Sequence, residues 1–256
     1  MVTVETIRFQ LLICLVFAHL FGDFLTQTDR DVANKHKVLI LAKHGAVVAL
    51  LTYAACGIWT EWRIPLLIFV SHTVIDFCKT SWGRGGVGSF LIDQAAHGLA
   101  IWLLVFWLAS PLPGGQLLWP RLLGKNYLSV LVFLSGVVAA VRFSSFLIAM
   151  AVQPMLSQIE TKEHATGGGT PHRGLISGGY IIGQLERLLI FLFVMVDYPE
   201  GIGFLLAAKS VLRFGEVKNP EQRMEAEYII IGTLMSFGLG IVVAFATKWV
   251  LQQIVS

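Results

Sequence analysis

The sequence predicts an all-α membrane protein, a polytopic transmembrane helix bundle of about eight helices. Hydrophobic residues make up 55% of the 256 residues and charged residues only 14%, and the mean hydropathy is +0.72, well on the apolar side of soluble proteins. Several apolar runs reach the roughly 20 residues that cross a bilayer as a helix. These run lengths argue against an apolar soluble domain, and the small net charge of +3 argues against nucleic-acid binding.

Apolar length and helix-breaking residues place the helices in order along the chain. The first four are expected at residues 6–28, 36–59, 64–82 and 88–109, and the next four at 126–152, 176–197, 201–215 and 227–252. The seventh is short for a full span, so a re-entrant segment there would reduce the count to seven. Lys and Arg concentrate in the loops after the odd-numbered helices, which places those loops on the cytoplasmic side.

The stretch "SPLPGGQLLWP", residues 110–120, concentrates Pro and Gly and predicts a division of the chain. Residues 1–112 form a His/Asp-rich four-helix half that we predict to be duplicated. Residues 113–256 form a second helical half that carries basic and acidic residues within its apolar helices. A Gly-rich cytoplasmic loop is expected at residues 165–179.

A shift of 53 residues aligns the polar residues of the first two helices with those of the next two. The shift superposes two such units, each of two helices, so the copies cross the membrane in the same direction, as parallel repeats do. We therefore predict a parallel two-helix repeat within the first four helices. The superposed pairs are His19 and His72, Asp23 and Asp76, Phe24 and Phe77, Ala42 and Ala95, His44 and His97, and Gly45 and Gly98.

Each copy carries an HxxxD motif, which places the two side chains on one face of a helix. Ionisable side chains in lipid are costly, so they normally face a bundle interior and pair there. Neutral imidazoles and carboxylates suit a divalent metal such as Zn, Mn or Fe, whereas His–Asp pairs without metal relay protons or fasten helices. The predicted metal ligands are His19, Asp23, His44, His72, Asp76 and His97.

Two charged residues distinguish the second copy from the first. Asp93 falls opposite Ile40, and Lys79 has no basic counterpart. We predict both as catalytic residues: the His and Asp cluster with Asp93 supplies a general base, and Lys79 neutralises Asp76 or contacts an anionic group. The alternative for Lys79 is a lysine that extends from a helix end toward the membrane surface.

The second half places further charges within apolar helices. Arg187, Lys209 and Arg213 are predicted to bind an anionic lipid head group or a phosphate, and ion pairs that fix the bundle are the alternative. Five polar residues are predicted to support the two sites. They are Gln27, Lys35, Gln94, Glu186 and Glu227.

The motifs "HLFGDFLTQ", "KHKVLILAKH", "SHTVIDFCK" and "FLIDQAAH" occur in this order along the first half. Over residues 9–110 the chain resembles a family of bacterial integral membrane proteins known as domain of unknown function 3307, and the second half is similar to the C-terminal part of longer members. The resemblance implies a multi-pass protein of the bacterial inner membrane. It supports the polar positions of the motifs and implies no particular activity.

These patterns predict an intramembrane metal-dependent hydrolase or transferase that acts on a lipid or lipid phosphate at the cytoplasmic leaflet. A proton- or ion-coupled transporter or flippase that uses the paired His and Asp residues is the alternative, and the parallel repeat favours it. A third hypothesis is a non-catalytic membrane scaffold or sensor, in which the polar pairs only fasten the helices.

Overall fold

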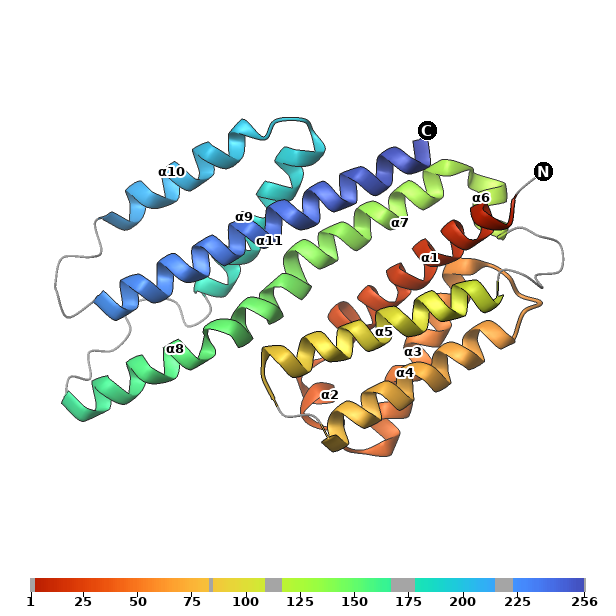
Figure 1. Cartoon of the computed structure of the whole chain (residues 1–256), viewed down its shortest axis with the longest axis horizontal. Helices are drawn as coiled ribbons and strands as arrows, with labels where there is room; N and C mark the ends of the chain where they lie inside the picture. Colours follow the sequence, from red (N-terminus) through yellow and green to blue (C-terminus); the bar gives the residue numbers. More distant parts are fainter. Residues whose placement is uncertain (1–2, 83–84, 109–116, 167–177, 215–222, 256) are drawn as a thin grey trace. The chain divides into compact units, whose positions relative to one another are not determined.

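The computed structural model describes residues 3–82, 85–108, 117–166, 178–214 and 223–255. These residues form helices and contain no strand, and seven of their helices are long and apolar enough to cross a membrane (Figure 1). The prediction of an all-α polytopic bundle is therefore confirmed, with the smaller of the two predicted helix counts. The chain forms two compact units, Met1–Val138 with Val250–Ser256 and Ala139–Trp249.

The first unit begins with a long helix that changes its winding before it ends. Helix α1, Val4–Phe21, is capped by the Thr3 hydroxyl and continues directly into a π-helical turn, η1, Gly22–Thr26. Helix α3, Val38–Cys56, ends where Gly57 adopts a left-handed conformation with φ of 63°, which glycine adopts at little cost. The remaining helices of the unit are α2 (Asp29–Ala33), α4 (Arg63–Trp82), α5 (Val87–Leu108), α6 (Leu118–Leu123) and α7 (Lys125–Val138).

Four helices of this unit form a ring around a buried core. Helix α1 packs against α3 and α5, and α4 packs against the same two helices, so that each member of the ring contacts two others. Helix α7 packs against α1 from outside the ring. Leu11, Leu15, Val48 and Ile64 lie in the buried core, while large apolar side chains such as Trp102 are exposed. Exposed apolar side chains on long helices suit a lipid environment.

Two glycines allow the helices of the ring to approach closely. A Cβ atom on Gly22 would lie 2.5 Å from Val48 Cγ2 on α3. A Cβ atom on Gly45 of α3 would overlap Thr73 Oγ1 on α4 and meet the Phe69 ring at 3.4 Å. Because no larger residue fits these two contacts without displacement, the glycines set the spacing of α1, α3 and α4.

The second unit contains a π-helical turn, η2 (Ala139–Phe143), followed by α8 (Ser144–Thr166), α9 (Gly178–Met195), α10 (Glu200–Phe214) and most of α11 (Arg223–Val255). Helix α9 packs against η2, α8 and α10. Helix α10 has only 15 residues and is not among the seven long apolar helices of the described residues. It corresponds to the segment predicted at 201–215, which was expected to be short for a span.

Three boundaries differ from the sequence-based expectations. The compact unit extends past residue 112 to Val138 because α7 packs against α1. The helix expected at 126–152 is interrupted by η2 and runs on to Thr166. Part of the expected Gly-rich loop at 165–179 is helical, since α8 includes Thr166 and α9 begins at Gly178, and residues 167–177 lie outside the described residues.

Candidate metal centre

The His and Asp residues of the first unit meet at one end of the helix ring. His19 lies in the last turn of α1 and Asp23 in η1, whereas His44 lies near the start of α3. His72 lies at the middle of α4 and Asp76 in its second half, and Asp93 and His97 lie in the first half of α5. Successive helices of the ring run in opposite directions (Figure 1), so these positions fall at the same depth.

The π-helical turn gives Asp23 a setting that differs from that of Asp76. A π-helix adds one residue to the turn and changes the direction of the side chains that follow. Asp23 is the second residue of η1, while Asp76 lies on a regular α-helical turn of α4. The two positions superposed by the 53-residue shift therefore differ locally, and the duplication stays a prediction.

Four atoms from four side chains converge at the centre of the ring. His44 Nε2 lies 3.2 Å from Asp23 Oδ1 and 3.5 Å from Asp76 Oδ2. His72 Nε2 lies 3.3 Å from Asp23 Oδ1 and 3.6 Å from Asp76 Oδ2. The two Nε2 atoms are 2.9 Å apart. All four side chains are at least nine-tenths buried.

These distances are close to the spacing of neighbouring ligand atoms around a metal ion. Zinc is bound tetrahedrally by His nitrogen and carboxylate oxygen at about 2.0–2.1 Å, which places neighbouring ligand atoms about 3.3 Å apart. Five of the six distances between the four atoms range from 2.9 to 3.6 Å, and Asp23, His44 and His72 each offer a ligand atom within 4.8 Å of the others. Two imidazole nitrogens and two carboxylate oxygens also form a donor set that binds divalent transition metals. The residues present therefore fit a divalent ion.

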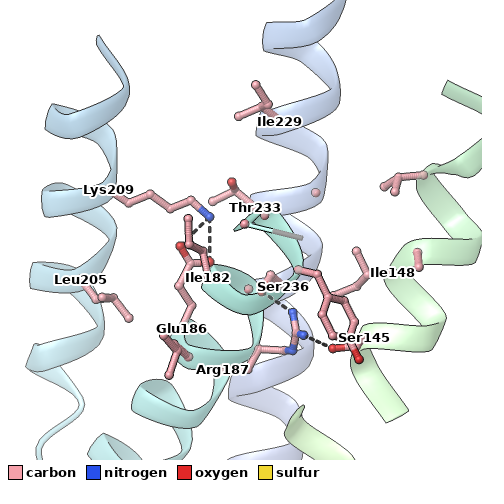
Figure 2. A pocket seen from close by; sticks show the side chains of 18 of the residues that line it. Ser145, Ile148, Ile182, Glu186, Arg187, Leu205, Lys209, Ile229, Thr233 and Ser236 are labelled. Carbon is pink, nitrogen blue, oxygen red and sulfur yellow. Dashed lines mark hydrogen bonds and ion pairs between the residues drawn. The ribbon is translucent and has the colours of Figure 1, made fainter. Parts of the chain in front are cut away.

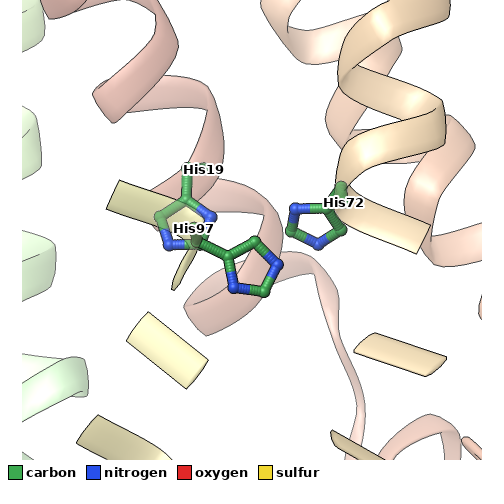
Figure 3. A group of neighbouring side chains, drawn as sticks. All are labelled: His19, His72 and His97. Atoms are coloured by element: carbon green, nitrogen blue, oxygen red, sulfur yellow. The ribbon is translucent and has the colours of Figure 1, made fainter. Parts of the chain in front are cut away.

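Two further imidazole rings, those of His19 on α1 and His97 on α5, lie beside His72 of this group (Figure 3). The His97 ring centroid lies 4.9 Å from that of His19 and 4.4 Å from that of His72. His19 Nε2 is 3.3 Å from Gln94 Oε1, an acceptor, so this nitrogen carries the proton of the neutral ring. His19 Nδ1 is then a lone pair, 3.9 Å from Asp23 Oδ2, and a small cavity of about 10 Å³ adjoins all three rings.

Two lysines balance part of the negative charge of the centre. Lys35 Nζ lies 2.9 Å from Asp76 and donates to its Oδ1. Lys79 Nζ donates to Asp93 Oδ2 at 2.7 Å. Lys35 comes from the turn before α3, and sequence reasoning gave it only a supporting place although it contacts a buried carboxylate. With neutral imidazoles, three carboxylates face two ammonium groups within this cluster, so one negative charge is in excess.

Gln94 joins the two sides of the cluster. Its Nε2 donates to Asp93 Oδ2 at 3.1 Å and to Asp23 Oδ2 at 3.5 Å. Gln94 thus orients two carboxylates and one imidazole, as residues around metal ligands commonly do. Gln27 Nε2, by contrast, is buried without a hydrogen-bond partner among the described residues.

The fold and the composition define a multi-pass helical membrane protein. Residues 11–114 match the protein family described as Protein of unknown function (DUF3307), which confirms the resemblance seen in the motifs of the first half. No curated protein and no solved structure matches the chain. The matched segment contains all seven His and Asp residues of the centre.

The residues predicted to bind an anion belong to the second unit, where a cavity of about 800 Å³ is lined by α8, α9, α10 and α11 (Figure 2). Arg187 lines it but is buried and already bonded: Nε donates to the Ala140 carbonyl at 2.9 Å and Nη1 to Ser236 Oγ at 2.9 Å. Its Nη2 donates to Ser145 Oγ at 2.5 Å. The sequence pattern indicates Ser236 only as part of a small-residue packing face with Gly232 and Gly240, and it does not single out Ser145.

The other charges of this unit are partly paired. Lys209 Nζ contacts the Glu186 carboxylate at 2.7 Å, as the ion-pair alternative predicted. Glu227 is exposed near the start of α11. Arg213 lies on α10, but its side chain lies outside the described residues.

Proposed function

We propose that this protein is an intramembrane metal-dependent hydrolase or transferase of the bacterial inner membrane that acts on a lipid phosphate at the cytoplasmic leaflet. The observation that supports it is that His44 Nε2 and His72 Nε2 lie 2.9 Å apart and each lies 3.2–3.6 Å from a carboxylate oxygen of Asp23 and of Asp76. Two imidazole nitrogens and two carboxylate oxygens are donors that suit zinc among the divalent metals. When bound, such an ion polarises a phosphoryl oxygen and lowers the pKa of a bound water.

His19 is the residue that we propose to accept the proton of the attacking water. Its Nε2 faces the acceptor Oε1 of Gln94, so its Nδ1 holds the lone pair within the cluster. Nδ1 is buried and has no hydrogen-bond partner among the described residues. The cavity of about 10 Å³ beside His19, His72 and His97 is near the smallest that admits a water molecule, about 10–15 Å³.

The charge of the cluster supports an anionic substrate. Its three carboxylates and two lysines leave a single negative charge with neutral imidazoles, and a divalent ion would make the site positive. Lys79, one third exposed, is the cation of this cluster that is most open to an incoming group. A phosphate ester carries the negative oxygens that such a site binds.

The location of the cluster supports a lipid as the carrier of that phosphate. Every ligand side chain projects from a helix that is long and apolar enough to cross a membrane. Large apolar residues such as Leu99 and Trp102 are exposed on the same helices. A substrate anchored in the bilayer can approach such a site by lateral diffusion, whereas a fully water-soluble substrate would have to enter against the apolar surroundings.

The first experiment measures the metal content of the purified protein in detergent by elemental analysis. We expect at least one zinc, manganese or iron ion per chain, and its loss in His44→Ala and His72→Ala. His36→Ala is the matched control, because His36 is exposed on the turn before α3, and it should retain the metal. A folded wild-type protein that holds no divalent metal after reconstitution would contradict the proposal.

The second experiment measures phosphate release and head-group transfer from phosphatidic acid in vesicles that contain the protein. Activity should require the metal, fall in His44→Ala, and fall in His19→Gln while the metal is retained. The metal-bound protein could instead release no product from any lipid phosphate and move protons or metal ions across the vesicle membrane, with this movement abolished by Asp23→Asn. That result would contradict the enzyme hypothesis and support the transporter hypothesis.

A further inference from the structure

We propose that Asp93, His97 and Asp76 hold a second divalent cation, so that the centre contains two metal ions that share the Asp76 carboxylate. This inference rests on the proposed function, whose first metal is held by Asp23, His44, His72 and Asp76. One ligand-type atom from each of Asp76, Asp93 and His97 lies within 4.8 Å of the others. All three side chains are buried.

The strongest support comes from three polar atoms that lack hydrogen bonds. Asp76 Oδ2, Asp93 Oδ1 and His97 Nε2 are buried, and none has a hydrogen-bond partner within the described part of the chain, although Lys35 Nζ forms an ion pair with Asp76 Oδ2 at 2.9 Å. A buried polar group left without a partner typically costs about 1–3 kcal/mol, so such groups are rare. Three of them, on residues that lie together, form the donor set of a cation.

The hydrogen bond of the His97 ring leaves its other nitrogen free to bind a metal. His97 Nδ1 lies 2.9 Å from the carbonyl oxygen of Asp93, one helical turn earlier. A carbonyl only accepts, so Nδ1 donates and carries the proton of the neutral ring. Nε2 then holds a lone pair, and its basicity is raised by the bond at Nδ1. Metal-binding imidazoles usually have this arrangement.

The Asp93 carboxylate likewise has one oxygen that accepts hydrogen bonds and one that accepts none from the described residues. Lys79 Nζ and Gln94 Nε2 both donate to Oδ2, at 2.7 and 3.1 Å. The other oxygen, Oδ1, is left without a hydrogen bond among the described residues. Two donors on Oδ2 fix the orientation of the carboxylate, and the lone pairs of Oδ1 can bind a cation. Asp93 is therefore a metal ligand in this proposal, and His19 is the general base.

Asp76 is the residue that both ligand sets share. Lys35 Nζ donates to its Oδ1 at 2.9 Å and also lies 2.9 Å from its Oδ2, and Oδ2 lies 3.5 and 3.6 Å from the Nε2 atoms of His44 and His72. Paired metal ions in hydrolytic sites lie about 3.5–4 Å apart and act on the attacking and leaving oxygens together. A carboxylate between the two ligand sets is suited to hold both ions at such a spacing.

A second cation would also favour a substrate with a higher negative charge. The cluster carries one excess negative charge, so two divalent ions would give it a clear positive charge even with a bound hydroxide. A phosphate monoester, which carries close to two negative charges at neutral pH, compensates this charge better than a neutral ester. A lipid phosphate monoester is therefore the substrate that we expect to bind most tightly.

The first test counts zinc ions by elemental analysis after the detergent-purified protein has been stripped and reloaded. Wild-type protein should bind two ions per chain, and Asp93→Asn and His97→Ala one each. Asp29→Asn is the matched control, because Asp29 is exposed on α2, and it should bind two. A single ion in the wild type that is lost in His72→Ala would overturn the second site and leave the proposed function standing.

The second test loads the wild-type protein with Mn²⁺ and records its electron paramagnetic resonance spectrum. Two ions joined by a carboxylate should give an exchange-coupled spectrum, and Asp93→Asn should give that of an isolated ion. The wild-type measurement does not depend on the folding of any variant. Isolated-ion spectra at full loading, or two coupled ions in Asp93→Asn, would contradict the proposal.

Discussion

His44 Nε2 and His72 Nε2 lie 2.9 Å apart although the two rings project from different helices, α3 and α4. The helices can bring them this close because Gly45, next to His44, presents no side chain to Thr73 and Phe69. The two imidazoles share one small volume with the oxygens of Asp23 and Asp76. The helix spacing at Gly45 is therefore a condition for the proposed metal centre.

Gly45→Ala should separate α3 from α4 and weaken metal binding. The added methyl group would overlap Thr73 Oγ1, and threonine cannot turn away easily because its χ1 angle is restricted. Overpacking of this kind typically costs about 1–3 kcal/mol. We expect a lower unfolding midpoint in detergent and a metal affinity reduced by an order of magnitude, measured by titration with a competing chelator.

The control for this variant is Gly98→Ala. Gly98 is superposed on Gly45 by the 53-residue shift, but a Cβ atom there meets open space among the described residues. Alanine is favoured over glycine within a helix by about 1 kcal/mol, so Gly98→Ala should leave metal binding unchanged and stability equal or higher. Equal metal affinity in both alanine variants would show that the spacing at Gly45 does not matter.

Lys35→Met should destabilise the metal-free protein. The Asp76 side chain is 1% exposed and Lys35 is its ammonium partner at 2.9 Å, so the variant leaves a buried carboxylate without that charge. Removing one partner of a buried ion pair typically costs about 3–5 kcal/mol. The measurement is the unfolding midpoint of metal-stripped protein in a denaturing detergent.

Lys37→Met is the control for Lys35→Met, because Lys37 lies on the same turn but is exposed. It should shift stability by no more than about 0.5 kcal/mol, as exposed substitutions usually do. Adding Asp76→Asn to Lys35→Met should recover part of the lost stability, since the unpaired charge is then gone. Equal stability of the Lys35 and Lys37 variants would contradict the importance of the buried pair.

Much of the centre could be predicted because it depends on helix geometry alone. A spacing of four residues puts His72 and Asp76 on one face, and apolar run lengths put all the polar residues at one depth. Because a charged side chain in lipid is costly, those polar helix faces are oriented toward the interior of the bundle. The gathering of the side chains follows from these rules, and their role as metal ligands stays a prediction.

The remaining features depend on contacts that no local pattern encodes. The π-helical turns at Gly22–Thr26 and Ala139–Phe143 insert one residue without a sequence signature. Lys35 contacts Asp76 from the turn before α3. That contact depends on the position of the turn relative to the four-helix ring. The packing of α7 against α1, which extends the first unit to Val138, is likewise a tertiary contact.

The N-terminal cap of α2 gives a prediction about pH. The Thr28 side chain hydrogen-bonds the Asp31 carboxylate, and Lys43 adds a second contact at 3.1 Å. These contacts, that of Thr28 first, hold the pKa of Asp31 below its ordinary value. A lowered folded-state pKa means that the stabilisation is complete above the ordinary Asp pKa and is lost as pH falls through the lowered one.

Thr28→Val should therefore raise the pKa of Asp31 toward its ordinary value, and the variant should lose less stability than the wild type on acidification. Carbon-13 NMR titration of the Asp31 carboxyl measures this directly. Lys43→Met should raise the same pKa by a smaller amount, since the Thr28 contact is the larger cause. A larger rise in the pKa of Asp31 from Lys43→Met than from Thr28→Val would show that Lys43 is the larger cause of the lowered pKa.

Arg187 is expected to stabilise the second unit by binding the π-helical turn η2. A π-helical turn shifts the backbone hydrogen bonds by one residue and leaves carbonyl groups to find other donors. Arg187 Nε donates to the Ala140 carbonyl at 2.9 Å, and its two Nη atoms reach Ser236 and Ser145. Lysine has neither the planar fork nor enough donors in this geometry to make these bonds together.

Arg187→Lys should therefore lower the stability of this unit even though the charge is kept. Hydrogen bonds with one charged partner are worth about 1.5–3 kcal/mol each, so the loss of two predicts a cost of about 3 kcal/mol or more. Hydrogen exchange should become faster at Ala139–Phe143 before other parts of α8 and α9 respond. Arg142→Lys is the comparison, because Arg142 donates to the exposed Tyr180 hydroxyl, and it should cost less. Unchanged exchange in Arg187→Lys would mean that η2 is held by its neighbours rather than by the guanidinium.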